Sequence, residues 1–105
     1  IQVGLQDGEF VPFQFVLGQN YPNPFNPSTT IPWGVSESSR VRISVYDFTG
    51  RMLAALVDEG REPGYYTTFW KADLPTGVYL CRLEAEPISA PGRVFSETRK
   101  MLLLR

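Results

Sequence analysis

The chain has 105 residues, a formal net charge of −1, a single cysteine and no histidine. A chain of this length fits one domain with one hydrophobic core. The near-neutral charge gives no electrostatic reason to expect binding to nucleic acid or to an anionic membrane surface. No apolar run approaches the ~20 residues that a membrane-spanning helix needs, so the sequence predicts no transmembrane segment.

The absence of histidine makes catalytic and metal-binding functions less expected. Histidine is the commonest general base, the commonest metal ligand and the usual partner of a nucleophilic Ser or Cys. Cys81 lies on an apolar strand face between Tyr79 and Leu83 and is expected to be a small buried hydrophobe. The carboxylates are scattered singly, as solvated surface charges usually are. The sequence therefore predicts no catalytic residues, no metal site and no cofactor, although loops rich in Asn and Asp could supply the oxygen ligands that calcium needs.

The first part of the chain shows little periodicity. Residues 1–13 mix Gly, Gln, Asp and Pro, and the chain does not begin with methionine. We interpret residues 1–14 as a linker from an upstream domain, or the end of that domain. Residues 15–105 are expected to form the domain itself.

A proline-rich stretch follows, "QNYPNPFNPSTT" at residues 19–30. Proline lacks a backbone donor and disfavours the α region for the residue before it, so neither a helix nor a central strand is expected here. We predict a rigid crossing from one sheet of a sandwich to the other. Its asparagines are expected to cap neighbouring backbone donors through Asx turns, and Phe25 is expected to plug the end of the core.

The rest of the chain alternates short apolar segments with turn signals. The stretch "RVRISVYD" alternates Val41, Ile43 and Val45 with Arg42, Ser44 and Tyr46, the pattern of a half-buried strand. Asp47 and Gly50 suit the first and fourth positions of a type I turn. The apolar run "RMLAALV" fits either a helix turn or a strand, and its short length favours a strand.

Three more strands are expected towards the end of the chain. They are "GYYTTFW", "VYLCRLEAE" with Tyr79, Cys81, Leu83 and Ala85 on one face, and the closing "RVFSETRKMLLLR". In the last of these, either Met101 and Leu103 or the alternating set of Lys100, Leu102 and Leu104 should face the core. Turn signals every 8–12 residues predict an all-β sandwich of about seven antiparallel strands without long helices.

Four stretches, taken together and in order, resemble a known family. They are "FVLGQNYPNPFNPSTTI", "VRISVYDFTGRMLAALVDEG", "GYYTTFWKADLPTGVYLCRL" and "TRKMLLLR". They are similar to the C-terminal sorting domain of type IX secretion cargo in the Bacteroidetes and related phyla. That domain is itself similar to the immunoglobulin-like domain of the flagellar hook-capping protein.

The resemblance implies an immunoglobulin-like sandwich without catalysis of its own. It implies recognition in the periplasm by the outer-membrane type IX translocon and delivery of an upstream cargo to the cell surface or beyond it. It further implies a surface sortase-like peptidase that can remove the domain, with the cleavage point in the linker.

The family motifs also point to particular residues. The sorting and recognition residues that the resemblance implies are Arg99, Lys100, Met101, Leu103, Leu104 and Arg105, with Thr98 beside them. The structural motif residues are Asn20, Tyr21, Pro22, Asn23, Pro24, Phe25, Asn26, Pro27, Val45, Tyr46, Asp47, Gly50, Arg51, Gly77, Val78, Tyr79, Arg82 and Leu83.

Other functions remain open at this stage. The tyrosines, Trp33 and Trp70 could form the stacking platform of a carbohydrate-binding module, although the two tryptophans are more simply explained as core residues. A structural spacer or assembly module of a secreted protein is a further alternative. An enzyme is the least favoured, because no nucleophile–base pair is present.

Overall fold

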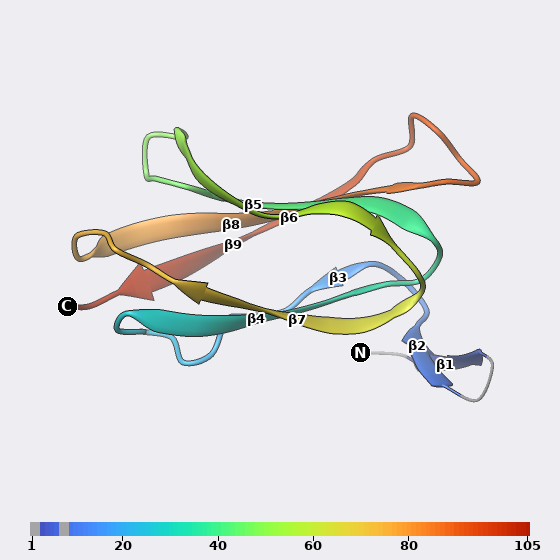
Figure 1. Cartoon of the computed structure of the whole chain (residues 1–105), viewed down its shortest axis with the longest axis horizontal. Helices are drawn as coiled ribbons and strands as arrows, with labels where there is room; N and C mark the ends of the chain where they lie inside the picture. The colour runs from blue at the N-terminus through green and yellow to red at the C-terminus, as the bar shows by residue number, and fades with distance from the viewer. Residues whose placement is uncertain (1–2, 7–8) are drawn as a thin grey trace.

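The computed structural model describes residues 3–6 and 9–105, and the side chains from residue 11 onward. No helix occurs in this described part, and seven of its nine strands form two packed antiparallel sheets, as Figure 1 shows. The smaller sheet has the order β3-β4-β7 and the larger the order β6-β5-β8-β9. The strands are β3 (Val16–Leu17), β4 (Ser28–Val35), β5 (Ser39–Tyr46), β6 (Met52–Arg61), β7 (Gly64–Lys71), β8 (Gly77–Pro87) and β9 (Phe95–Leu103). The predicted all-β sandwich with about seven strands is confirmed.

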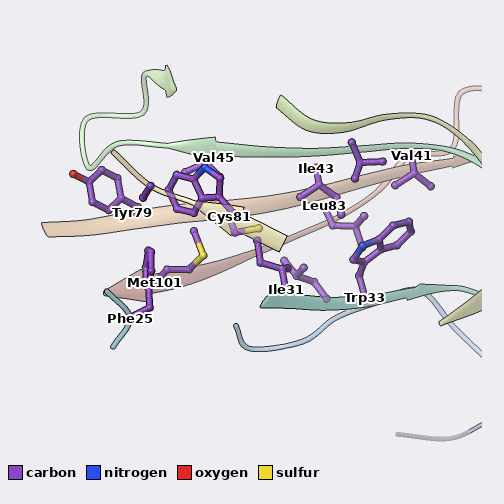
Figure 2. Packing of buried hydrophobic residues seen from close by; sticks show 14 of the residues in the cluster. Phe25, Ile31, Trp33, Val41, Ile43, Val45, Tyr79, Cys81, Leu83 and Met101 are labelled. Carbon is purple, nitrogen blue, oxygen red and sulfur yellow. The ribbon is translucent and has the colours of Figure 1, made fainter. Parts of the chain in front are cut away.

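The core lies between the two sheets and is filled by the inward side chains of both. Trp33 of β4 and Ile43 and Leu83 of the larger sheet are at most 1% exposed. Figure 2 shows these residues towards one end of the sandwich, with Phe25, Tyr79 and Met101 towards the other. The period-2 alternation of β5 and β8 thus decides which face is buried.

One residue of the predicted polar face of β5 departs from expectation. Ser44 alternates with the core residues, as predicted, but it is fully buried and its hydroxyl oxygen has no hydrogen-bond partner among the described residues. It lies opposite Ala55 on β6 and Arg82 on β8. The outer face of a central strand is covered by its neighbours' side chains, so alternation alone does not predict exposure.

The run "RMLAALV" forms a strand, as favoured, and β6 is an edge of the larger sheet. The register between β5 and β6 shifts between Ile43 and Ser44 and again between Val45 and Tyr46, so Leu53 and Leu56 are extra residues on the edge. Bulges of this kind disrupt the regular edge that would otherwise pair with another chain.

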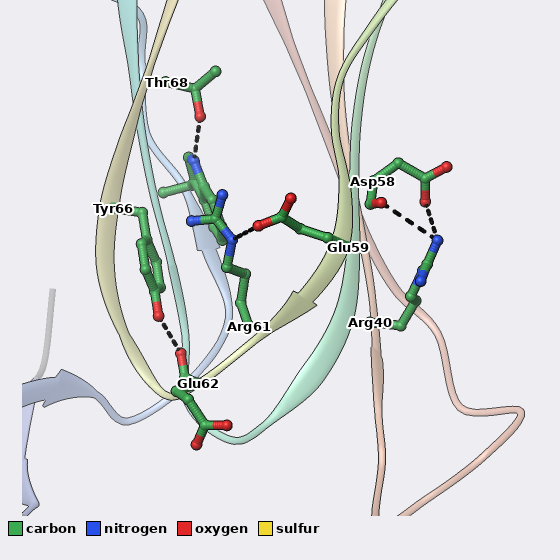
Figure 3. A network of polar contacts seen from close by, with 8 residues as sticks. Arg40, Asp58, Glu59, Arg61, Glu62, Tyr66 and Thr68 are labelled. Atoms are coloured by element: carbon green, nitrogen blue, oxygen red, sulfur yellow. Dashed lines mark hydrogen bonds and ion pairs between the residues drawn. The ribbon is translucent and has the colours of Figure 1, made fainter.

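A cation–aromatic cluster joins β6 of the larger sheet to β4 and β7 of the smaller sheet at one side of the sandwich. The guanidinium carbon of Arg61 lies 5.0 Å from the ring centre of Tyr66 and 5.4 Å from that of Trp33. Arg61 Nε also donates to Glu59 Oε2 at 2.8 Å, and the indole N–H of Trp33 donates to Thr68 Oγ1 at 2.9 Å (Figure 3). The cluster joins strands of different sheets without a disulfide.

A hairpin that the sequence analysis did not predict precedes the sandwich. It consists of β1 (Val3–Gln6) and β2 (Glu9–Pro12), paired antiparallel. Pro12 lies against Gly34 so closely that a Cβ built there would stand 3.0 Å from Pro12 Cγ and 3.1 Å from Tyr65 Cδ1. Gly34 therefore permits β2 to dock on the smaller sheet. The assignment of residues 1–14 to a linker stays a prediction.

Cys81 is 1% exposed, as expected, and burial raises the pKa of its thiol to about 12. Because the thiolate is the reactive form, we expect native protein at pH 8 to react with a disulfide reagent far more slowly than protein unfolded in urea. Equal rates in the two states, followed by absorbance, would show that the β8 core opens readily.

Within residues 3–6 and 9–105, there is no helix with the length and apolar character needed to cross a bilayer.

Candidate functional site

The proline-rich segment, residues 19–27, connects β3 to β4. These strands are antiparallel neighbours in the same sheet. The prediction that the segment crosses from one sheet to the other is therefore wrong. Its three X–Pro bonds, at Pro22, Pro24 and Pro27, are cis. The segment instead bulges out beside the sandwich and returns, and on the way it contacts the last strand of the opposite sheet.

That contact is made by backbone hydrogen bonds to the free edge of β9. Phe25 N donates to Leu102 O at 2.9 Å, and Leu104 N donates to Phe25 O at 3.0 Å. Asn23 Oδ1 accepts from Leu102 N at 2.9 Å. Asn23 thus caps a donor 79 residues away, not a neighbouring one as predicted. Edge groups that would otherwise be unpaired are satisfied within the chain.

The Phe25 side chain is 2% exposed and lies with its ring centre 5.7 Å from that of Trp70. The predicted role of Phe25 as a plug for the end of the core is confirmed, and Figure 2 places it next to Met101. Because its backbone is tied to β9 and its ring is buried under β7, this one residue joins the segment to both sheets.

The segment has its own buried polar anchor. Asn20 is 3% exposed, and its amide nitrogen donates to Thr29 Oγ1 at 3.0 Å and to Pro22 O at 3.2 Å. Thr29 Oγ1 in turn donates to Pro22 O at 2.9 Å. A proline carbonyl without these donors would be partly buried and unpaired, which costs stability. Tyr21, Asn23 and Asn26, by contrast, are exposed.

The terminal strand divides the predicted sorting residues into three groups. Met101 and Leu103 are at most 1% exposed and belong to the core, whereas Lys100 and Leu104 point away from it and are exposed. Arg99 Nε donates to Leu17 O at 2.9 Å, so this guanidinium holds β3 against β9. Arg105 contacts the β7–β8 loop through Leu74 O and Thr76 Oγ1. Of the six, only Lys100 and Leu104 are exposed without a side-chain bond to another part of the described chain.

Sequence reasoning missed the residues that line the free edge of β9. Gln19 Nε2 donates to Lys100 O at 2.9 Å, and Glu97 Oε1 accepts from Leu17 N at 3.4 Å. Gln19 belongs to the proline-rich stretch, but nothing in its local sequence indicates a partner 81 residues away. Together these bonds bring the proline-rich motif and the terminal motif side by side.

The β5–β6 turn has the predicted form. Gly50 N donates to Asp47 O at 3.0 Å, and Gly50 has a positive φ of 91°, a conformation that side chains resist. Asp47 Oδ1 accepts from Thr49 Oγ1, Arg51 N and Thr49 N at 2.6, 3.0 and 2.9 Å. The hydrogen bond from the Thr49 side chain, followed by that from the Arg51 amide, lowers the pKa of Asp47 below its ordinary value.

This carboxylate predicts a pH dependence of stability. Because the folded-state pKa of Asp47 lies below the unfolded one, the charge stabilises the fold at neutral pH. That contribution is lost as the pH falls from about 3.8 through the folded value. We expect Asp47→Asn to lower the melting temperature at pH 7 and to make little difference at the lowest pH at which both proteins fold. A melting-temperature difference that does not shrink on acidification would contradict this.

Some of the motif residues at the start of β8 have structural roles. The Tyr79 hydroxyl donates to Pro75 O at 2.7 Å and its ring meets Trp70 edge to face at 6.5 Å, which fixes the β7–β8 loop just before Gly77, the first residue of β8. Val78 and Arg82 point to the opposite, outer face and are exposed. Trp33 and Trp70 are 1% and 8% exposed, so they are core residues and form no stacking platform.

Comparisons with known proteins agree with this architecture. A family model described as "Secretion system C-terminal sorting domain" matches residues 19–94, from the proline-rich segment to the loop before β9. Among solved structures, the chain is similar to the crystal structure of dimeric latent PorU from Porphyromonas gingivalis, with a TM-score of 0.64 and 21% identity. The similarity covers 86% of this chain and 9% of that one, and at this identity it shows the fold alone. No curated protein matches the chain.

The family match spans well over half of the chain, and it contains the three motifs that the structure assembles into the proline-rich segment, the β5–β6 turn and the start of β8. The chain belongs to the family of secretion system C-terminal sorting domains, the signals that direct proteins through the type IX secretion system to the cell surface.

Proposed function

We propose that this domain directs an upstream cargo to the outer-membrane type IX translocon, and that the translocon recognises the folded domain through exposed side chains of its last strand and of the residue that follows it. The observation that carries the proposal is the division along β9 and Leu104, the residue that follows it. Lys100 and Leu104 are exposed, while Met101 and Leu103 are buried in the core. A partner that binds the folded domain therefore meets the first pair and not the second.

The outer edge of β9, the side that does not pair with β8, supports recognition by side chains and not by an added strand. Where residues 19–25 cover this edge, Lys100 O and the backbone groups of Leu102 are already bonded within the chain. A partner strand added at this position would have to displace those bonds. Contact with the outward side chains requires no such rearrangement.

Further steps belong to the same proposal. A surface sortase-like peptidase would cut within residues 1–14 and release the domain after translocation. The domain itself would contribute no catalysis, in keeping with a sequence that has no histidine and a cysteine held in the core. A carbohydrate-binding role is not favoured, because both tryptophans are buried.

The test uses a reporter protein fused upstream of the whole chain, expressed in a bacterium with a type IX system. We expect the double variant Lys100→Ser/Leu104→Ser to remain folded and to leave most of the reporter in the periplasm. The matched control is Lys71→Ser/Phe69→Ser, which removes the same kinds of exposed side chain from β7 of the other sheet. Exposed substitutions usually change stability by under about 0.5 kcal/mol. Normal delivery by the folded β9 variant would show that these side chains are not the signal.

A further inference from the structure

The outer side of the larger sheet carries a hollow that none of the structural roles above requires. Five residues line it: Tyr46, Gly50, Leu80, Arg82 and Thr98. They come from β5, the β5–β6 turn, β8 and β9. In Figure 1 the β5–β6 turn bends away from the sandwich at the end where β9 finishes. Of the lining residues, Gly50 belongs to this turn and the others to the three neighbouring strands.

The surroundings of the hollow are apolar on one side. Leu80 lies opposite Tyr46 on β5, and on the β9 side Val78 lies opposite Leu102. All four are on the outer face, and Val78 is 36% exposed. Gly50 has no side chain and contributes only backbone to the lining, and a Cβ at this position would meet no atom within 4 Å. Apolar and aromatic side chains in such an arrangement are typical of the centre of a binding surface.

The other side of the hollow is cationic. Arg82 lies opposite Thr98, and Lys100 lies opposite Leu80, so the two cations are diagonal neighbours across β8 and β9. In the part of the chain that the structure describes, neither is within ion-pair distance of a carboxylate, although six other arginines are. Arg82 uses only Nε, which donates to Ser96 Oγ at 3.1 Å.

A second, independent feature lies beside the hollow. Ser44 is directly opposite Arg82, is fully buried, and has a hydroxyl without a hydrogen-bond partner among the described residues. Most buried hydroxyls in proteins are paired. Arg82 itself donates only through Nε, to Ser96 Oγ, so the terminal nitrogens of its guanidinium have no hydrogen-bond partner among the described residues.

We infer that this hollow, together with Lys100, binds an acidic side chain flanked by apolar residues on a protein of the secretion machinery. The guanidinium of Arg82 would take the carboxylate, for which its planar fork of donors is suited. Tyr46 and Leu80 would cover an adjacent apolar side chain. The inference rests on the proposed function and deepens it, because it extends the recognised surface from β9 to the β5–β6 turn and β8.

The binding test uses defined peptides and the full chain. The probe is the peptide acetyl-Leu-Glu-Val-Glu-Leu-amide, and the control peptide has Gln in place of both Glu residues. We expect millimolar acidic peptide to shift the backbone amide signals of Gly50, Leu80, Arg82 and Thr98, and the shifts to weaken as salt screens the charges. Equal shifts with the Gln peptide, or none with the Glu peptide, would overturn the inference.

Two variants complete the test. Arg82→Gln should weaken peptide binding at least about fivefold, since it removes a charge-assisted pair of hydrogen bonds. Arg93→Gln, which removes an exposed cation from the β8–β9 loop, should leave binding unchanged. In the reporter assay, delivery by the parent domain together with normal delivery by Arg82→Gln would overturn this inference and leave the proposed function standing. Failure of the parent domain itself would instead overturn the proposed function.

Discussion

Replacing Phe25 with alanine is expected to lower the free energy of unfolding by about 3–5 kcal/mol, the usual cost of removing a fully buried phenylalanine. The ring is 2% exposed and packs on Trp70, and nothing else in the proline-rich segment reaches the core at this end. A domain usually has only about 5–15 kcal/mol of stability, so this one truncation is a large fraction of the total.

The measurement is urea unfolding of the parent and variant proteins. The two unfolding free energies are compared with the same m-value, the slope of the free energy against urea concentration. Phe69→Ala is the matched control, because Phe69 is 67% exposed on β7. Its effect should stay within about 0.5 kcal/mol. If Phe25→Ala cost no more than the control, the segment would not be seated in the core as described.

The second large effect is expected in the terminal strand. Leu103 is fully buried at the C-terminal end of β9, where it forms a bridge with Phe25. Leu103→Ala should cost about 2–5 kcal/mol. Its neighbour Leu104 is 47% exposed, so Leu104→Ala should cost far less.

The pair also separates fold from recognition. Leu103→Ala should reduce delivery of a fused reporter by unfolding the domain, and the loss should be reversed at lower temperature or by a stabilising background. A loss caused by changes at Lys100 and Leu104 should persist in protein that circular dichroism shows to be folded. Loss of delivery by Leu103→Ala in protein of unchanged stability would mean that a buried side chain is recognised, and would contradict this separation.

The sandwich could be predicted from the sequence because its evidence is local. Alternation in β5 and β8 identifies the inward residues, and Asp47 with Gly50 marks a turn whose hydrogen bonds lie within five residues. Even the ambiguous "RMLAALV" could be assigned from its length. These features depend on neighbours in the chain, and periodicity reports such neighbours well.

The course of the proline-rich segment could not be predicted, because long-range pairing decides it. The prolines indicate rigidity wherever the segment goes. Its return to the same sheet is fixed by β3–β4 pairing, and its contact with the opposite sheet by the bond between Asn23 and Leu102, 79 residues apart. The same limit explains why Gln19 and Glu97 were missed as edge residues.

The hairpin of β1 and β2, which was not predicted, has a turn signal in its local sequence. Asp7-Gly8 separates the two short segments in the sequence, and an Asp-Gly pair flanked by segments of alternating hydrophobic residues favours a two-residue hairpin turn. The composition of residues 1–13 as a whole obscured it. The close approach of Pro12 to Gly34, by contrast, depends on the tertiary structure alone.

In the candidate site, too, some features follow from the local sequence and others depend on long-range contacts. Burial of Met101 and Leu103 follows from alternation once one side of β9 is known to face the core. The hydrogen bonds of Arg99 to Leu17 and of Arg105 to the β7–β8 loop cannot be derived from alternation, because both partners lie far away in the chain. Charge in a terminal motif therefore did not distinguish structural arginines from the exposed Lys100.

The most direct test of the function as a sorting signal is to measure where the cell delivers a protein fused to this domain. A reporter fused upstream of the whole chain is expressed in a bacterium with an intact type IX translocon and in a strain that lacks it. External protease and antibody then measure the fraction at the cell surface. We expect surface exposure in the intact strain and retention in the periplasm in the other. Equal surface exposure in both strains, or periplasmic retention in both, would contradict the assignment of this domain as a type IX sorting signal.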